Sequence, residues 1–228
     1  MTPPRTAPSR TALLAGATGL VGRELLAQLL AHPAYGRVQV WLRRPVPGIE
    51  STRKLAVEQV DFTRPPAAPA NLKDTYIALG TTIKVAGSRE AFRQVDHDYV
   101  LNVARAARAA GAQRLAVDSA LGADRASRVF YNQVKGEMQA SVGALGFDSV
   151  AIAQPSLLLG DRAALGQPGR SGEVWATRLL GPLMGMVPRS VRPIEARAVA
   201  AAMIDAVLQA RAGVRILTSA EMQPVLSR

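Results

Sequence analysis

The stretch ALLAGATGLVG, residues 12–22, joins a short apolar run to a leucine-rich segment near the start of the chain. Its glycines, Gly16, Gly19 and Gly22, suit a tight turn between a strand and a helix, where a diphosphate approaches the backbone and the first helical amides point at its oxygens. Glycine turns that bind no ligand are also common, so the interpretation depends on the rest of the chain. The predicted cofactor-binding residues of this turn are Gly16, Thr18, Gly19, Leu20, Val21 and Gly22.

Short apolar runs alternate with helical patterns along the chain. The runs cover residues 12–15, 38–42, 55–60, 75–79, 114–117 and 150–153, and residues 214–218 are expected to form an edge strand. The helical patterns cover residues 20–31, 88–110, 128–145, 173–180 and 195–210. Strands that are apolar on both faces are typical of a parallel sheet with helices on each side. We therefore predict an α/β fold with a Rossmann-like, doubly wound parallel sheet.

Length and composition fit a single domain. The chain has 228 residues, of which 48% are hydrophobic and 20% charged, enough for one buried core. We expect a flexible tail over residues 1–10 and one NAD(P)-binding domain over residues 11–228. Within that domain, the glycine- and proline-rich residues 155–193 are expected to form a small region that caps a substrate pocket. Residues 63–71, interrupted by three prolines, are expected to form a loop.

Charge and composition also limit the possible partners. The formal net charge of +11 would suit a nucleic-acid-binding protein, but the arginines are scattered along the whole chain, so we expect no nucleic-acid partner. The chain has no cysteine and no apolar run of membrane-spanning length, from which we expect no membrane partner and a cytoplasmic location. His32 and His97 have no partners at metal-ligand spacing, and no metal site is predicted.

Three residues are candidates for catalysis. Tyr131 and Lys135 are four residues apart in a predicted helix, so they share one face, and a nearby ammonium makes a phenol a better proton donor. Ser119 follows the predicted strand at residues 114–117, where its hydroxyl could hold a substrate oxygen. The pair alone would also fit a solvated helix face, but its order after the glycine turn and Ser119 favours a site. No G-x-S-x-G stretch surrounds Ser119, which disfavours a serine hydrolase.

The end of the second predicted strand indicates the form of the cofactor. A carboxylate there would bind the ribose hydroxyls of NAD and repel the 2′-phosphate of NADP. The chain has Arg43 and Arg44 at this position and no acid. Guanidinium groups match phosphate oxygens in pairs, so NADP is predicted and NAD is less favoured. The alternative is that both arginines are ordinary solvated surface residues.

These residues resemble the short-chain dehydrogenases/reductases, in particular the atypical branch that includes the Tat-interactive-protein oxidoreductase. The resemblance extends from residue 12 to about residue 192 and includes LGTT at 79–82, VDHDYV at 95–100, GAD at 122–124, QVKGE at 133–137 and PSLLLGDR at 155–162. Several separate blocks in the same order make it more specific than any single motif.

The resemblance implies an NADP-dependent oxidoreductase that acts on a carbonyl or alcohol of a small substrate. Tyr131 would donate a proton to the carbonyl oxygen, Lys135 would hold the nicotinamide ribose, and Ser119 would orient the carbonyl. Further residues are implied around the cofactor: Leu79, Gly80 and Thr81 on the adenosine side, Asp61 and Phe62 beside the adenine, and Pro155, Ser156 and Leu157 beside the nicotinamide.

One position departs from the family pattern. Classical members have an asparagine that supports a water-linked proton relay, and this chain has Asp96 there, while Asn102 is expected to pack a helix. An added negative charge near the relay leaves open a second interpretation, an NADPH-binding redox sensor or regulatory protein without efficient turnover. The resemblance allows either a monomer or a homodimer. The residues Leu183, Met184, Met186 and Val187 could line a substrate pocket or pack in the core.

Overall fold

The computed structural model describes residues 10–159 and 187–223. Seven parallel strands form one sheet in the order β3-β2-β1-β4-β5-β6-β9. The strands are β1 (Arg10–Ala15), β2 (Tyr35–Leu42), β3 (Leu55–Gln59), β4 (Leu72–Ile77), β5 (Arg114–Asp118), β6 (Ser149–Gln154) and β9 (Gly213–Thr218). The first six have the strand order of a Rossmann fold, so the predicted fold class is confirmed.

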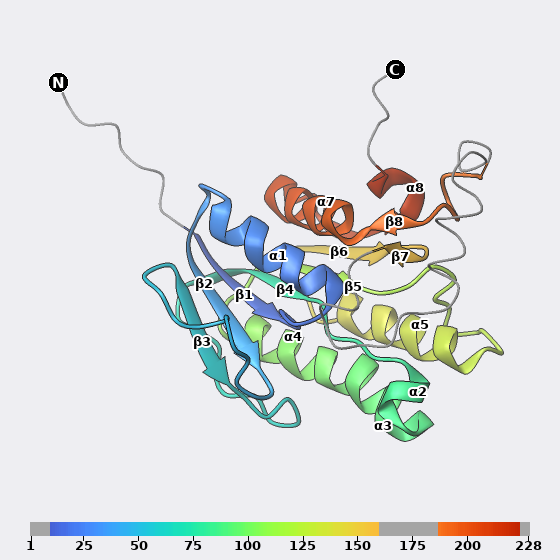
Figure 1. The fold of residues 1–228 in the computed structure, drawn as a ribbon, viewed down its shortest axis with the longest axis horizontal. Coiled ribbons are helices and arrows are strands. Elements are labelled where there is room, and N and C mark those ends of the chain that lie inside the picture. Colours follow the sequence, from blue (N-terminus) through green and yellow to red (C-terminus); the bar gives the residue numbers. More distant parts are fainter. Residues whose placement is uncertain (1–9, 160–186, 224–228) are drawn as a thin grey trace, which may run out of the picture.

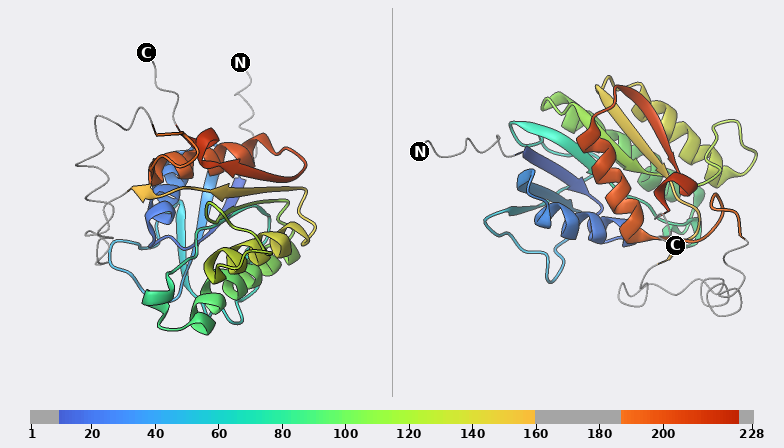
Figure 2. Two further views of the ribbon diagram at one scale, coloured as in Figure 1. Left: turned by 90° about the vertical axis from the view of Figure 1, so that its right-hand side faces the viewer. Right: turned by 90° about the horizontal axis from the view of Figure 1, so that it is seen from above.

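Helices cover both faces of the sheet (Figures 1 and 2). α1 (Leu20–Ala31) and α7 (Ala196–Gln209) lie over one face, and α4 (Tyr99–Ala109) and α5 (Phe130–Gly143) lie over the other. Alternate residues of β1 supply the two cores: Leu14 packs with α1 and α7, and Leu13 packs with α4 and α5. Both leucines are fully buried, as expected for a central strand of a doubly wound sheet.

The predicted helix at residues 88–110 is continuous but changes its winding. It consists of α3 (Arg89–Arg93), a π-helical turn η1 (Gln94–Asp98) and α4. The Ser88 hydroxyl accepts a hydrogen bond from the Ala91 amide at the start, and Gly111 follows the end at φ +91°. A π-turn inserts one extra residue per turn and is frequent at functional sites. The π-turn η1 contains Asp96, which is fully buried.

Short elements that the sequence did not indicate complete the described part of the chain. These are α2 (Ile83–Ala86), α8 (Ser219–Met222) and a pair of parallel strands, β7 (Leu158–Leu159) and β8 (Ile194–Glu195). The first strand begins at Arg10, which was expected to belong to the tail. The predicted helix at residues 173–180, most of the capping region and the positions Leu183, Met184 and Met186 lie outside the described residues. Within the described residues, 10–159 and 187–223, no helix has the length and apolar character needed to span a bilayer.

Candidate active site

A pocket of about 200 Å³ lies at the carboxyl ends of the central strands. This edge is where ligands bind in open parallel sheets, because the loops after the strands diverge there. The lining comes from five parts of the chain: the start of α1, the segment after β4, the π-turn, the end of β5 with α5, and the segment after β6. The lining residues are Gly19, Leu20, Val21, Ala78, Leu79, Gly80, Thr81, Thr82, Val85, Asp96, Asp118, Ser119, Ala120, Tyr131, Lys135, Pro155, Ser156 and Leu158.

The glycine turn brings a helix N-terminus to this pocket. Gly16 has φ +96°, and a Cβ there would lie 2.4 Å from the carbonyl carbon of Ala78. A Cβ on Gly22 would lie 1.9 Å from the Gly16 carbonyl oxygen, so only glycine lets α1 approach the turn this closely. Gly19 is the N-cap of α1 and provides no side-chain cap. The first amides of α1 therefore remain available for a diphosphate, which the turn can cradle.

Lys135 and Asp96 form a buried ion pair beside the pocket. The Lys135 Nζ lies 2.8 Å from the Asp96 Oδ1, and the two side chains are 5% and 0% exposed. The other Asp96 oxygen, Oδ2, accepts a hydrogen bond of 2.8 Å from the Thr81 amide. A Cβ on Gly80 would lie 3.4 Å from the Asp96 Oδ1, which leaves little space for a side chain there. The π-turn thus holds the Asp96 carboxylate in direct contact with Lys135, the candidate catalytic lysine.

The charges of this pair are coupled. Burial alone would lower the pKa of Lys135, but the attraction of Asp96, Tyr131 and Asp118, together with the hydrogen bond to Asp96, raises it above its usual range. Burial raises the pKa of the Asp96 carboxyl, and the Lys135 ammonium and the Thr81 amide partly offset that effect. A raised lysine pKa keeps the ammonium charged at neutral pH, as a group that holds ribose hydroxyls and polarises a phenol must be.

Ser119 is oriented by two glutamine side chains. The Gln139 Nε2 donates a hydrogen bond of 2.6 Å to the Ser119 Oγ, and the Gln154 Nε2 donates one of 3.1 Å to the Gln139 Oε1. Gln139 lies on α5, one turn after Lys135, and Gln154 ends β6. Because the Ser119 oxygen accepts a hydrogen bond from Gln139, the Ser119 hydroxyl can donate its own proton to an oxygen in the pocket.

Tyr131 lines the same pocket from the first turn of α5. Its ring packs on that of Phe92, with ring centroids 5.3 Å apart. It interacts electrostatically with Lys135, four residues further along the helix. The pocket therefore brings the three predicted catalytic residues together: a hydroxyl, a phenol and an ammonium.

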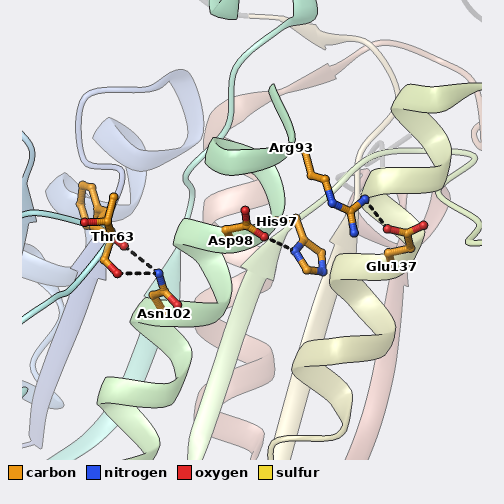
Figure 3. A network of polar contacts seen from close by, with 7 residues as sticks. Thr63, Arg93, His97, Asp98, Asn102 and Glu137 are labelled. Carbon is orange, nitrogen blue, oxygen red and sulfur yellow. Dashed lines mark hydrogen bonds and ion pairs between the residues drawn. The ribbon is translucent and has the colours of Figure 1, made fainter. Parts of the chain in front are cut away.

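Polar contacts around the π-turn hold it between α5 and the loop after β3 (Figure 3). Arg93 pairs with Glu137 on α5, and the His97 Nδ1 lies 2.7 Å from the Asp98 Oδ1. Further along the helix, the Asn102 Nδ2 donates hydrogen bonds to the backbone oxygens of Phe62 (3.0 Å) and Thr63 (3.1 Å). Asn102 thus anchors the loop that follows β3.

The predicted cofactor residues divide into two groups. Gly19, Leu20, Val21, Leu79, Gly80, Thr81, Lys135, Pro155 and Ser156 line the pocket, whereas Gly16, Thr18, Gly22, Arg43, Arg44, Asp61, Phe62 and Leu157 do not. Of the second group, Arg43 and Arg44 are exposed directly after β2. The Asp61 carboxylate accepts hydrogen bonds from the Thr63 amide and hydroxyl, both of 2.8 Å. The Phe62 ring is buried against that of Tyr99, with ring centroids 5.9 Å apart.

Sequence reasoning missed Asp118 and several apolar or small lining residues. Asp118 ends β5, whose residues 115–117 are apolar and fully buried. A carboxylate that ends a buried strand immediately before a candidate catalytic serine is the signal that could have identified it. Among the residues with described side chains, no three histidine, cysteine or carboxylate groups are placed to hold a metal ion.

Comparison with known proteins identifies the family. Residues 16–146 match the family model described as "NAD(P)H-binding". The chain belongs to this family. It is 32% identical over 214 residues to "Protein FMP52, mitochondrial" of Eremothecium gossypii, covering 92% of this chain and 95% of the relative. It is 35% identical over 179 residues to "Protein HTATIP2" of Rattus norvegicus, covering 77% of this chain and 72% of the relative.

Solved structures agree on the fold of this family member. The enzyme WbmG of Bordetella bronchiseptica, solved in complex with NAD, superposes with a TM-score of 0.66 at 16% identity, covering 96% of this chain and 76% of that one. At this identity the likeness concerns the fold alone. The family model and the FMP52 and HTATIP2 relatives confirm the resemblance to atypical short-chain dehydrogenases/reductases and place the chain in an NAD(P)-binding, oxidoreductase-like family.

The expected cytoplasmic location is wrong by the same comparison. The FMP52 relative carries the word mitochondrial in its name, as do matching FMP52 proteins of four further fungi. The expectation depended on the absence of cysteine and of a long apolar run. Both features fit a mitochondrial protein equally well, so composition could not distinguish the two compartments.

Proposed function

We propose that the protein is an NADP-dependent oxidoreductase that transfers hydride between the cofactor and a carbonyl or alcohol carbon of a small substrate. The observation that carries the proposal is the buried Lys135, held by Asp96 in a pocket that also contains Ser119 and Tyr131. The uncapped start of α1, which lines the same pocket, supplies the amides for a diphosphate.

In this mechanism the nicotinamide, when bound, supplies or accepts the hydride. The Ser119 hydroxyl, fixed by Gln139, donates a hydrogen bond to the substrate oxygen and orients the carbonyl. The Tyr131 hydroxyl gives its proton to that oxygen as negative charge develops on it. The Lys135 ammonium stabilises the resulting phenolate and is itself held in place by Asp96. In the opposite direction Tyr131 accepts the proton of the alcohol.

The preference for NADP is argued from charge. Arg43 and Arg44 are exposed immediately after β2, and β2 pairs with β1, which leads into the glycine turn. A 2′-phosphate on the adenosine ribose would pair with their guanidinium groups. Titration of the chain with NADPH and NADH, followed by nucleotide fluorescence, tests this. We expect NADPH to bind at least about tenfold more tightly than NADH, which is the effect of one additional charge-assisted hydrogen bond.

Two variants separate the cofactor from the catalytic part of the proposal. The double variant R43A/R44A should weaken NADPH without weakening NADH, whereas R37A, which removes an exposed arginine near the amino end of β2, should change neither. Tyr131→Phe should leave NADPH affinity within about twofold of native but lower turnover of any carbonyl substrate by about 10²- to 10⁴-fold. Equal affinities for the two nucleotides, or full activity in Tyr131→Phe, would contradict the respective part.

A second candidate is an NADPH-binding redox sensor or regulatory protein without efficient turnover. The Asp96 carboxylate favours it, because its ion pair with Lys135 neutralises much of the positive charge that would stabilise a Tyr131 phenolate. A screen of carbonyl compounds for NADPH consumption distinguishes the two functions. Rapid consumption with any of them supports the enzyme, and tight NADPH binding without consumption supports the sensor.

A further inference from the structure

Asp118 is a charged pocket residue that the mechanism above does not use. It ends β5 and lines the pocket beside Ser119. Its Oδ1 is buried and accepts no hydrogen bond among the described residues. In a half-buried carboxylate, an oxygen that is itself buried and lacks a donor is costly unless the group is protonated or a cation lies beside it. Asp118 is therefore placed to respond to a positive charge that enters the pocket.

The pocket itself supplies little positive charge to Asp118. Of the lining residues the titratable ones are Asp96, Asp118, Tyr131 and Lys135, which come from the π-turn, β5 and α5. The neighbouring ends of β4 and β6 contribute uncharged residues, including Ala78 and Pro155. Lys135 is the one cationic side chain in this set, and it already lies 2.8 Å from Asp96. Two carboxylates thus share a single ammonium.

Asp118 is consequently poised to change charge near neutral pH. Burial raises its pKa to about 7, with the attraction of Lys135 opposing the rise and the repulsion of Asp96 adding to it. Lys135 has a raised pKa and stays charged through this range. A cation bound next to Asp118 would favour the carboxylate and displace its proton.

We propose that Asp118 makes the pocket prefer the oxidised cofactor over the reduced one. The inference rests on the proposed function, in which the nicotinamide end of the cofactor occupies the part of the pocket formed by Ser119, Tyr131 and Lys135. The nicotinamide ring is positively charged when oxidised and neutral when reduced, while the rest of the two cofactors is the same. An ionised Asp118 attracts only the oxidised ring, and a protonated Asp118 distinguishes the two forms weakly.

The preference has consequences for protons and for the direction of the reaction. Binding of NADP⁺ to the protonated form yields the Asp118 carboxylate and one released proton, whereas binding of NADPH releases none at this residue. A charge pair in such a site changes an equilibrium by a factor on the order of ten. Tenfold tighter binding of the oxidised form lowers the two-electron potential of the bound cofactor by about 30 mV. Above neutral pH the bound NADPH is thus a stronger reductant than it would be without the Asp118 charge, which offsets part of the cost of the proton that carbonyl reduction consumes.

The test is the ratio of two dissociation constants, for NADPH and for NADP⁺, measured at pH 6 and pH 8. NADPH is titrated by its fluorescence and NADP⁺ by competition. The 2′-phosphate also titrates near pH 6, but it is common to both nucleotides and cancels in the ratio. We expect NADP⁺ to gain about tenfold relative to NADPH between pH 6 and pH 8. Calorimetry at pH 7 in two buffers of different ionisation enthalpy should show more proton release with NADP⁺ than with NADPH.

Asp118→Asn should abolish the pH dependence of the ratio. Asp205→Asn is the matched control, because it removes an exposed carboxylate on α7 that does not line the pocket. It should behave like the native chain. A ratio that does not change with pH in the native chain, or that changes equally in Asp118→Asn, overturns the role of Asp118 and leaves the proposed function standing. Failure of both nucleotides to bind overturns the proposed function and this inference with it.

Discussion

At the scale of single residues, Asp118 links the site to the stability of the fold. Its pKa is raised to about 7 in the folded chain, chiefly by burial, from its ordinary value of 3.8. Below pH 3.8 the Asp118 carboxyl is protonated in both the folded and the unfolded chain, and its full contribution to the free energy of unfolding is present. Between the two values the folded chain keeps a proton that the unfolded chain releases, so the free energy of unfolding falls as pH rises. The loss is complete once pH exceeds the folded value.

Asp118→Asn should remove this loss. Between pH 5 and pH 7 the native chain should lose about 2–3 kcal/mol of unfolding free energy relative to the variant, at 1.36 kcal/mol per pH unit. Urea denaturation of both proteins at the two pH values measures the difference. Asp205→Asn, which changes an exposed carboxylate on α7, should track the native chain within about 0.5 kcal/mol. A parallel pH dependence in native chain and Asp118→Asn would show that Asp118 is ionised throughout.

At the scale of elements, the segment that runs through α3, η1 and α4 connects the reactive pocket to the loop after β3. Asp96 in the π-turn holds Lys135, and Asn102 on α4 holds the backbone oxygens of Phe62 and Thr63. The loop after β3 is where we expect the adenine to bind. One helical segment therefore positions both ends of the proposed cofactor site.

Asn102→Ala should weaken NADPH binding several-fold and lower the free energy of unfolding by about 1 kcal/mol, because two backbone oxygens lose their donor. Arg108→Ala is the control on the same helix: it removes a comparable hydrogen bond, from Arg108 Nε to the Gly146 oxygen, 2.8 Å long and outside the pocket. It should leave NADPH affinity unchanged. Fluorescence titration and urea denaturation of both variants measure the two effects. If Asn102→Ala and Arg108→Ala bind NADPH equally well, the loop after β3 does not belong to the cofactor site.

The elements that sequence could predict are those with strong periodicity. The six predicted runs each overlap one of the strands β1 to β6, because a short apolar run bounded by turn residues is typical of a strand, and residues 214–218 became the edge strand β9. The π-turn could not be predicted, since the pattern of apolar residues in 88–110 fits a regular α-helix equally well. Its effect is local: it buries Asp96 against Lys135, so a residue that sequence marked only as a departure from the family is a direct partner of the candidate catalytic lysine.

For the candidate site, the sequence showed which residue types were present but not which of them become buried. Sequence supplied Ser119, Tyr131 and Lys135 because residue type and order are visible in it, and the pocket brings them together. It did not supply Asp118, because an aspartate at the end of a strand is as often solvated as buried. Whether such a carboxylate has a donor, or a pKa near 7, depends on elements distant in sequence that close around it.

At the scale of the whole molecule, the two edges of the sheet have different roles. The carboxyl edge contains the pocket, whereas the amino edge contains a buried polar cluster around Asp74, at the amino end of the central strands. The Tyr35 hydroxyl donates a hydrogen bond of 3.0 Å to the Asp74 Oδ2 and lies 2.6 Å from the Tyr76 hydroxyl. Arg10 and Arg114 lie 3.3 and 3.5 Å from the same carboxylate. Burial raises the pKa of Asp74, and Arg10 and the Tyr35 hydroxyl offset part of the rise.

Tyr35→Phe tests whether the two edges are independent. The variant keeps the buried ring but removes a donor from a carboxylate with no exposed side-chain surface, so the free energy of unfolding should fall by about 1–3 kcal/mol. NADPH affinity should stay within about twofold of native, because neither Tyr35 nor Asp74 lines the pocket and mutations that share no partners act additively. Urea denaturation and NADPH titration of the same preparation measure both. Loss of NADPH affinity in a folded Tyr35→Phe chain would mean that the sheet transmits changes from its amino edge to the site.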